Sequence, residues 1–172
     1  VVTIARYPGW SGKEKVLGMM LEKQVGFGKA SSVSVHFKGM LVGLEPGVTG
    51  GWHVHTGYSC DDTDAVGGHY YDGLAADPWT LSNTNYNSDG SGVARISKTM
   101  PSFSLYGEWP VYGRTVVVHE SNSAVKPACG VIGVGASSYD AAVLSMDKYS
   151  VCPAGSCQTF TVNGMLKLSS MG

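Results

Sequence analysis

The sequence predicts an all-β domain of the sandwich or barrel kind, and three observations support this prediction. Short runs rich in Val, Ile, Thr and aromatic residues recur along the chain, and 24 glycines punctuate them. The 172 residues are 43% hydrophobic and only 15% charged, which is enough apolar material for one sizeable core. No internal repeat, linker or low-complexity tract divides the chain. We therefore expect one β domain.

The individual strands follow from β-branched and aromatic content bounded by turn formers. In chain order the predicted strands are residues 1–6, 16–23, 32–38, 52–56, 93–96, 114–120, 131–134 and 159–168. In the third of these, alternation places His36 on the face opposite Val35 and Phe37, which favours an exposed strand histidine over a metal ligand. The SDGSG segment at residues 88–92 predicts a tight hairpin turn. Residues 70–87 have weak periodicity and many turn formers, which predicts a long loop.

Charge and hydropathy exclude two classes of partner. The formal net charge is −1 and no basic cluster is present, so nucleic acid and anionic membrane surfaces are not expected as partners. No apolar stretch approaches the roughly 20 residues that span a bilayer, and the residues from Val1 onward do not resemble the charged start and apolar core of a signal peptide. A chain without an initial Met is expected to be a processed form or a domain of something longer, where neighbouring domains are further candidate partners.

Cysteine usage bears on the compartment. Four cysteines allow three pairings, and the CPAGSC segment makes Cys152 with Cys157 the natural local bridge, which leaves Cys60 for Cys129. Two disulfides predict an oxidising environment and hence a secreted or extracellular protein. The alternatives are four free thiols or a thiolate metal site, although no Cys-x-x-Cys pair is present.

Four of the five histidines have the arrangement of a metal site. In GGWHVHTG, period-two alternation puts His53 and His55 on one face of a strand. His119 ends another β-branched run and can come from a neighbouring strand, while His69 follows two glycines that can turn a loop back. Four imidazoles without thiolate or carboxylate favour copper, although the residue types do not exclude zinc.

Five blocks, in the order WHVHTGYSC, GGHYY, SDGSGVARI, GEWPVYGRTVVVHE and ACGVIG, resemble the copper/zinc superoxide dismutase family. The resemblance covers about residues 1–135 and implies a Greek-key β-sandwich or barrel, with residues 136–172 as a C-terminal β extension. It also implies one copper ion per domain, superoxide as substrate and an intrasubunit disulfide between Cys60 and Cys129. The implied copper ligands are His53, His55, His69 and His119, with His69 at the position that bridges copper to zinc.

Departures from the family pattern indicate its copper-only branch. No histidine lies between Tyr70 and Ser91, where the family has further zinc ligands, so zinc is not expected. Residues 120–128 form a short segment that lacks the family's aspartate linking the two metal sites. Lys126 stands where the family commonly has an arginine that attracts superoxide; it keeps the charge and loses the planar fork. A solvated loop lysine is an equal alternative at this position.

The predicted function is a copper-only superoxide dismutase that produces oxygen and hydrogen peroxide by Cu(II)/Cu(I) cycling. In this hypothesis His69 detaches on reduction and hands a proton to peroxide. Without zinc, a carboxylate is expected to hold the second nitrogen of His69. The candidates are Asp72, Asp77, Asp89 and Glu108, the first two ranking highest because they lie in the loop after His69. The alternatives are a non-enzymatic extracellular copper-binding or copper-storage domain on the same fold, and structural zinc in the four-histidine site.

Two further segments carry expectations. The alternating TFTVNGMLKL segment predicts a strand or hairpin in the C-terminal extension, packed on the same domain or against a neighbouring one. The acidic run Asp61, Asp62 and Asp64 lacks the rest of a calcium loop and predicts a polar turn.

Overall fold

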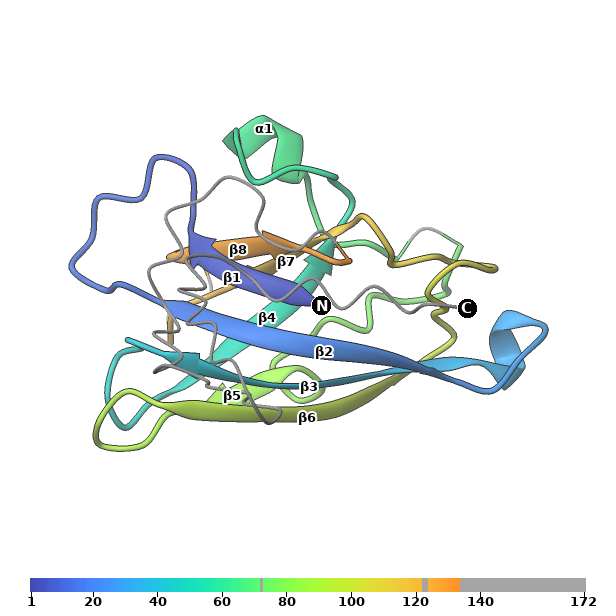
Figure 1. Cartoon of the computed structure of the whole chain (residues 1–172), viewed down its shortest axis with the longest axis horizontal. Coiled ribbons are helices and arrows are strands. Elements are labelled where there is room, and N and C mark those ends of the chain that lie inside the picture. Colours follow the sequence, from blue (N-terminus) through green and yellow to red (C-terminus); the bar gives the residue numbers. More distant parts are fainter. Residues whose placement is uncertain (72, 122–123, 134–172) are drawn as a thin grey trace, which may run out of the picture.

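The computed structural model describes residues 1–71, 73–121 and 124–133, and in them eight antiparallel strands form one sheet that curls into a nearly closed barrel (Figure 1). The strands are β1 (Val2–Arg6), β2 (Leu17–Val25), β3 (Ser34–Val42), β4 (Thr49–His55), β5 (Asn85–Asn87), β6 (Ala94–Pro101), β7 (Thr115–Val118) and β8 (Ala128–Val131). Their order across the sheet is β5-β4-β7-β8-β1-β2-β3-β6. The chain therefore crosses from one half of the sheet to the other between β3 and β4, between β5 and β6, and again between β6 and β7. These crossings confirm the predicted Greek-key β-barrel.

The barrel interior is filled by the alternate residues of its strands. On β3, Val35, Phe37 and Leu41 are fully buried, whereas Lys38 and Met40 between them are exposed. The Phe37 ring lies 5.1 Å from the ring of Trp52 on β4, so the two halves of the sheet meet in one core. His36 lies on the other face of β3, where its Nδ1 pairs with Thr99 Oγ1 at 2.9 Å, as expected for a strand histidine outside the core.

A disulfide joins the loop after β4 to β8. Cys60 is bonded to Cys129, and their Cα atoms are 6.2 Å apart. This confirms the expected Cys60–Cys129 pairing. The expected Cys152–Cys157 bridge, like the whole of residues 136–172, lies outside the described residues. None of the helices in the described part of the chain has the length and hydrophobicity to span a bilayer.

Three segments differ from the sequence prediction. The strand expected at residues 131–134 lies three residues earlier in the chain, as β8, because the pairing with β7 and β1 begins at Ala128. Val134 lies outside the described residues. The loop expected at residues 70–87 contains β5, which pairs with the start of β4. The acidic turn continues into a short helix, α1 (Thr63–Val66), because the Asp62 side chain caps it by accepting a hydrogen bond from the Asp64 N–H at 2.8 Å.

The SDGSG segment forms a tight turn as predicted, but the turn does not close a hairpin of paired strands, because it joins β5 to β6, which lie at the two ends of the sheet order. Asp89 Oδ1 accepts hydrogen bonds from the Ser91 N–H and hydroxyl and from the Val93 N–H. Gly92 has a φ of 76°, and a Cβ there would lie 2.3 Å from the Leu44 carbonyl oxygen, so this position needs glycine. A further one-turn 3-10 helix covers Ala30–Ser32.

Candidate metal centre

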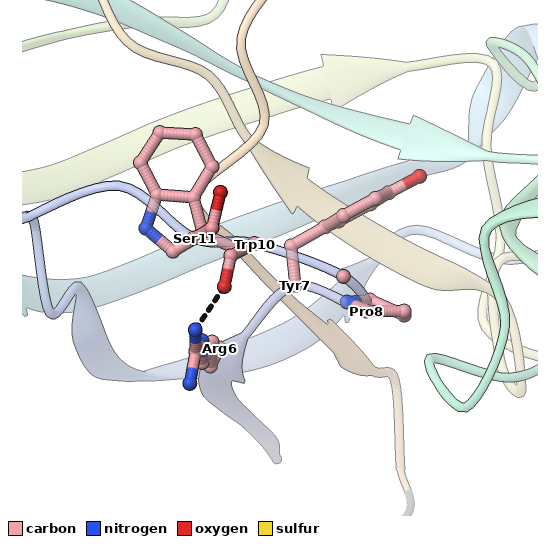
Figure 2. Close-up of a pocket in the computed structure, with 6 residues that line it drawn as sticks. Arg6, Tyr7, Pro8, Trp10 and Ser11 are labelled. Atoms are coloured by element: carbon pink, nitrogen blue, oxygen red, sulfur yellow. Dashed lines mark hydrogen bonds between the residues drawn. The ribbon is translucent and has the colours of Figure 1, made fainter.

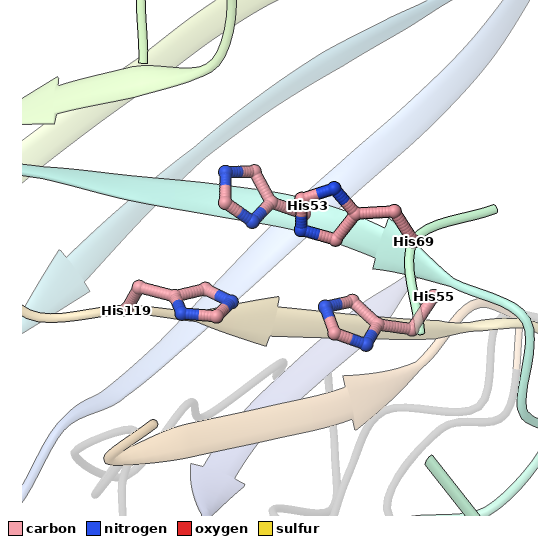
Figure 3. A group of neighbouring side chains, drawn as sticks. All are labelled: His53, His55, His69 and His119. Atoms are coloured by element: carbon pink, nitrogen blue, oxygen red, sulfur yellow. The ribbon is translucent and has the colours of Figure 1, made fainter. Parts of the chain in front are cut away.

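Four imidazole rings converge over the face of the β4–β7 pair that points away from the core (Figure 3). Each of His53, His55, His69 and His119 offers a ligand nitrogen, and these nitrogens all lie within 4.8 Å of one another. Within residues 1–71, 73–121 and 124–133, this is the one group of three or more His, Cys, Asp or Glu residues that could hold a metal ion. The structure thus brings together all four histidines singled out from the sequence.

Two adjacent strands position three of these rings. His53 and His55 share one face of β4, and buried Val54 faces the core between them. His119 follows the last residue of β7, and its N–H donates to the Gly51 carbonyl at 2.8 Å, which ties the end of β7 to β4. Gly51 also makes room for the site, because a Cβ there would lie 3.0 Å from His53 Nε2.

The fourth ring comes from a loop whose backbone is fixed on both sides of His69. The Thr56 N–H donates to the Gly68 carbonyl and the Tyr70 N–H donates to the Val54 carbonyl, each at 2.8 Å. These bonds lay the His69 segment against the end of β4. The side chain is nevertheless 27% exposed, whereas His53, His55 and His119 are at most 5% exposed as residues. His69 therefore forms the solvent side of the centre.

Hydrogen bonds determine which ring nitrogen of His55 and of His69 is available to a metal. His55 Nδ1 lies 2.8 Å from the Gly67 carbonyl, which can only accept, so Nδ1 carries the proton and Nε2 keeps a free lone pair. His69 Nδ1 lies 2.7 Å from Asp77 Oδ2, and a carboxylate likewise accepts. Both residues thus turn Nε2 toward the centre. This is how metal-binding imidazoles are oriented by their second nitrogen.

Unsatisfied nitrogens show that the residues fit a metal ion. Three buried ring nitrogens have no hydrogen-bond partner in the described part of the chain. They are Nδ1 and Nε2 of His53 and Nε2 of His55. Buried polar atoms without partners are rare, and a metal that accepts one lone pair from each ring would satisfy one nitrogen of His53 and Nε2 of His55. Four neutral nitrogen donors suit copper best among the common metals, although zinc also binds imidazole.

Burial keeps two of these imidazoles neutral. Burial, and then the neighbouring rings of His119, His69 and His55, lower the pKa of His53 to about 3. Burial also lowers the pKa of His55 to about 4, against the opposing effect of the Gly67 carbonyl and with further lowering by His69, His119 and Lys126. At neutral pH both rings are neutral imidazoles, each with one free lone pair, and this is the form that binds a metal.

Asp77 is the carboxylate that holds His69. Burial alone would raise the pKa of Asp77, but hydrogen bonds from His69 Nδ1 and from the Trp79 N–H outweigh burial and lower it. Of the other candidates, Asp89 is engaged in its own turn and Glu108 accepts from the Ala30 N–H at 3.0 Å. Asp72 lies outside the described residues.

Lys126 carries a positive charge that acts on one ring of the centre. Its charge is close enough to contribute to the lowered pKa of His55. Its Nζ is 5.8 Å from the centre of the Tyr7 ring. Tyr7 also lines a shallow surface pocket of about 540 Å³ formed by residues 6–11, in which the Arg6 guanidinium donates to the Trp10 carbonyl (Figure 2). No metal-ligating side chain lines that pocket.

Two residues that support the centre were missed in the sequence. Tyr86 is 2% exposed and donates its hydroxyl to the His119 carbonyl at 2.7 Å, and burial raises its pKa to about 12. Trp79 donates its N–H to Asp77 Oδ1 at 2.9 Å. Both lie in the segment predicted as a loop. A buried aromatic residue in such a segment was the available signal, but nothing in the sequence indicates its partner.

Comparison with known proteins gives a consistent result. The model of the family described as copper/zinc superoxide dismutase (SODC) matches residues 22–132, a span that includes all four histidines and both bonded cysteines. The chain is similar to the superoxide dismutase [Cu-Zn] of Cordyceps militaris, with 29% identity over 147 residues, 72% of this chain and 93% of that protein. The superoxide dismutase [Cu-Zn] of Schizosaccharomyces pombe is 27% identical over the same shares. Superoxide dismutase [Cu-Zn] 2 of Mesembryanthemum crystallinum is 28% identical over 127 residues, 59% of this chain and 80% of that protein.

Proposed function

Because this chain belongs to the copper/zinc superoxide dismutase family, it is an oxidoreductase that removes superoxide, and we propose that copper is the only metal it uses. The observation behind this proposal is the contact of 2.7 Å between His69 Nδ1 and Asp77 Oδ2. A histidine that bridges two metal ions needs both ring nitrogens as ligands. Here one nitrogen of His69 is already bonded to a carboxylate.

The remaining ligand chemistry supports the same proposal. A zinc site would need a second group of histidine, cysteine or carboxylate side chains, and the described residues contain none besides the four histidines. The His69–Asp77 pair supplies what the second metal would otherwise provide, namely a fixed orientation of the ring and an electron-rich Nε2. Zinc would then be unnecessary for holding His69 in place.

A copper ion bound by the four histidines would supply the one-electron chemistry, in which one superoxide is oxidised to oxygen and a second, with two protons, is reduced to hydrogen peroxide. The buried rings of His53, His55 and His119 would hold the ion at a site that is shielded from water. Their low exposure keeps water away from three sides of the centre. The substrate anion would then approach from the side of His69.

His69 is suited to moving a proton as well as binding. Its Nδ1–H is committed to Asp77, so Nε2 is the atom that either binds the metal or carries a proton. The side chain is 27% exposed, so a proton on Nε2 can exchange with solvent or pass to the product. We propose that Nε2 of His69 donates one of the two protons that are needed to form hydrogen peroxide.

Lys126 would attract superoxide by its charge. It lies close enough to His55 to affect the pKa of that ring, and it is only partly exposed, so its charge is less screened than that of a fully solvated lysine. A lysine supplies a point charge without the planar fork of arginine. Its contribution would therefore be to the rate of encounter rather than to the orientation of bound substrate.

We also propose an oxidising, extracellular location. The buried disulfide between Cys60 and Cys129 supports it, together with the even number of cysteines in the chain. Protein recovered from the culture medium without reductant should show no reactive thiol under denaturing conditions. Four reactive thiols would contradict this location.

The proposed activity can be tested on protein loaded with copper alone and stripped of loosely bound metal. We expect one copper per chain, bound through nitrogen donors in the electron paramagnetic resonance spectrum, and catalytic removal of superoxide in proportion to the copper bound. Stoichiometric, tightly bound copper without turnover would contradict the proposal. That outcome would make the protein a copper-binding domain that retains the site and not the reaction.

A further inference from the structure

Trp79 closes a ring of hydrogen bonds that includes His69. Its indole Nε1–H donates to the Tyr70 carbonyl at 2.6 Å, and its backbone N–H donates to Asp77 Oδ1 at 2.9 Å. The other carboxylate oxygen, Asp77 Oδ2, accepts from His69 Nδ1. Tyr70 directly follows His69 in the chain. The three hydrogen bonds and this peptide link therefore form a closed ring from His69 through Asp77, Trp79 and Tyr70 back to His69.

We propose that Trp79 is a positioning residue for His69, which keeps Asp77 on the ring nitrogen and so fixes the ligand without a second metal. The effect on catalysis that this inference implies rests on the proposed copper-only function. Its structural part, the control of the His69 ring through Asp77, concerns the protein without any metal. The two parts can therefore be tested separately.

The need for an anchor follows from the exposure of the pair. The Asp77 side chain is 34% exposed and that of His69 is 27% exposed, so water competes for the bond between them. An exposed ion pair or hydrogen bond that is free to open contributes little. Trp79 is 2% exposed, so water does not compete for its hydrogen bonds to Tyr70 and Asp77, and these bonds hold the loop in place.

Neighbouring contacts hold both Trp79 and its acceptor. The Trp79 ring lies 5.0 Å from the Phe103 ring and 6.3 Å from the Trp52 ring in the main core. Tyr70 is 3% exposed, and the Arg114 guanidinium stacks on it at 3.7 Å from the ring centre. An indole is the side chain that fills such an apolar space and still donates a hydrogen bond.

The alternative is that Trp79 only fills the core, and the chain contains a matched control for this possibility. Trp52 is fully buried and belongs to the same aromatic cluster, and its Nε1 has no hydrogen-bond partner among the described residues. Trp52→Phe and Trp79→Phe therefore remove the same volume from the same core. Only Trp79→Phe also removes a hydrogen bond.

The first measurement uses the metal-free full chain and nitrogen-15 NMR of the imidazole rings. In the wild type and in Trp52→Phe we expect His69 to be a single tautomer with the proton on Nδ1. In Trp79→Phe we expect a mixture of the two tautomers, because Asp77 no longer stays on Nδ1. A core-filling role would not change the His69 tautomer.

The second measurement is the affinity for Cu(II), by competition with a chelator. Loss of a residue that orients a metal ligand typically weakens binding about 10-fold or more. We expect about this loss for Trp79→Phe and less than about a 2-fold loss for Trp52→Phe, although both lose stability through the cavity they leave. In an Asp77→Ala background, Trp79→Phe should have no further effect on affinity.

Matching behaviour of the two Trp→Phe variants in tautomer and affinity would overturn the inference. If Trp79→Phe does not fold, replacing Trp79 alone with benzothienylalanine keeps the bicyclic shape and removes only the N–H, and the same outcomes apply. A wild type that needs zinc for turnover would overturn the proposed function and leave the tautomer result standing. The two failures are therefore distinguishable.

Discussion

The metal centre has two differently built sides. His53, His55 and His119 come from β4 and the end of β7, are at most 5% exposed, and owe their positions to strand register. His69 comes from a loop, has a 27% exposed side chain and owes its orientation to Asp77. The strand side supplies a rigid, dry set of donors. The loop side is where we propose that the substrate approaches and that His69 moves a proton.

This contrast bears on the proposed copper-only centre. Strand register is shared by the whole barrel, so changing it would disturb the core. A loop can exchange its contacts at much smaller cost. In this chain the loop places a carboxylate on His69, and the strand side needs no change to accommodate it.

Removing a strand ligand should have the largest effect. His119→Ala deletes a buried donor that no neighbour can replace, so we expect the Cu(II) affinity to fall by more than the roughly 10–100-fold that loss of an orienting partner costs, and superoxide removal to be lost. His36→Ala is the control, because that histidine pairs with Thr99 outside the centre. Retained turnover in His119→Ala would show that the strand side is not essential.

Acid should destabilise the metal-free protein through the strand side. The pKa values of His53 and His55 are about 3 and about 4 in the folded protein, against 6.5 for an ordinary histidine. Between those values the unfolded chain binds more protons, so the free energy of unfolding falls as the pH drops below about 6.5. We expect about 2 kcal/mol lost per histidine between pH 7 and pH 5.

Urea denaturation at pH 7 and pH 5 measures this loss. His55→Gln should reduce the pH dependence by about half, because one of the two titrating rings is gone, while His36→Ala should leave it unchanged. Bound copper should raise the free energy of unfolding at both pH values without removing this loss, because the protons that cause the loss bind to the unfolded chain. A free energy of unfolding independent of pH would contradict the neutral, buried state of the strand imidazoles.

On the loop side, Asp77→Asn tests the carboxylate. Asn keeps the shape and removes the charge that holds the proton on His69 Nδ1, so we expect copper affinity and turnover to fall about 10-fold to 100-fold. The control is Asp62→Asn, which removes one exposed charge but still caps α1. Equal results for the two variants would mean that Asp77 does not orient His69.

Lys126→Gln should have the smallest effect. Loss of one charge beside the centre should lower the association rate of superoxide about threefold at low ionic strength, and less at high salt, because the attraction is screened. Lys126→Arg should keep the rate. Lys38→Gln, on the exposed face of β3, is the matched control. If both Gln variants behave alike, Lys126 is a solvated loop lysine.

The sequence predicts the strand side of the centre better than the loop side. The alternation in WHVH places His53 and His55 on one face without further information, and His119 ends an unmistakable β-branched run. The barrel follows from the same patterns. The two glycines before His69 and the local CPAGSC segment, which leaves Cys60 for Cys129, indicate the fourth histidine and the disulfide that the structure contains, and the resemblance to a known family agrees with both.

The loop side depends on contacts between residues that no local pattern links. The sequence offers four carboxylates as partners for His69, and only the folded loop distinguishes Asp77 from Asp89 and Glu108. Strand β5 has just three residues, and it exists because Asn85–Asn87 meet the start of β4. Its buried residue, Tyr86, reaches His119 across 33 positions of sequence. Such contacts come from tertiary packing rather than from propensity.

The most direct test of a centre that needs no zinc is pulse radiolysis, with the rate of superoxide removal expressed per bound copper. The protein is measured with copper alone and again after zinc is added. We expect the same rate in both states; the yardstick is the diffusional ceiling of about 10⁸–10⁹ M⁻¹s⁻¹, of which superoxide dismutases are themselves a standard example. A rate that is low with copper alone and rises many-fold with one equivalent of zinc would contradict the account.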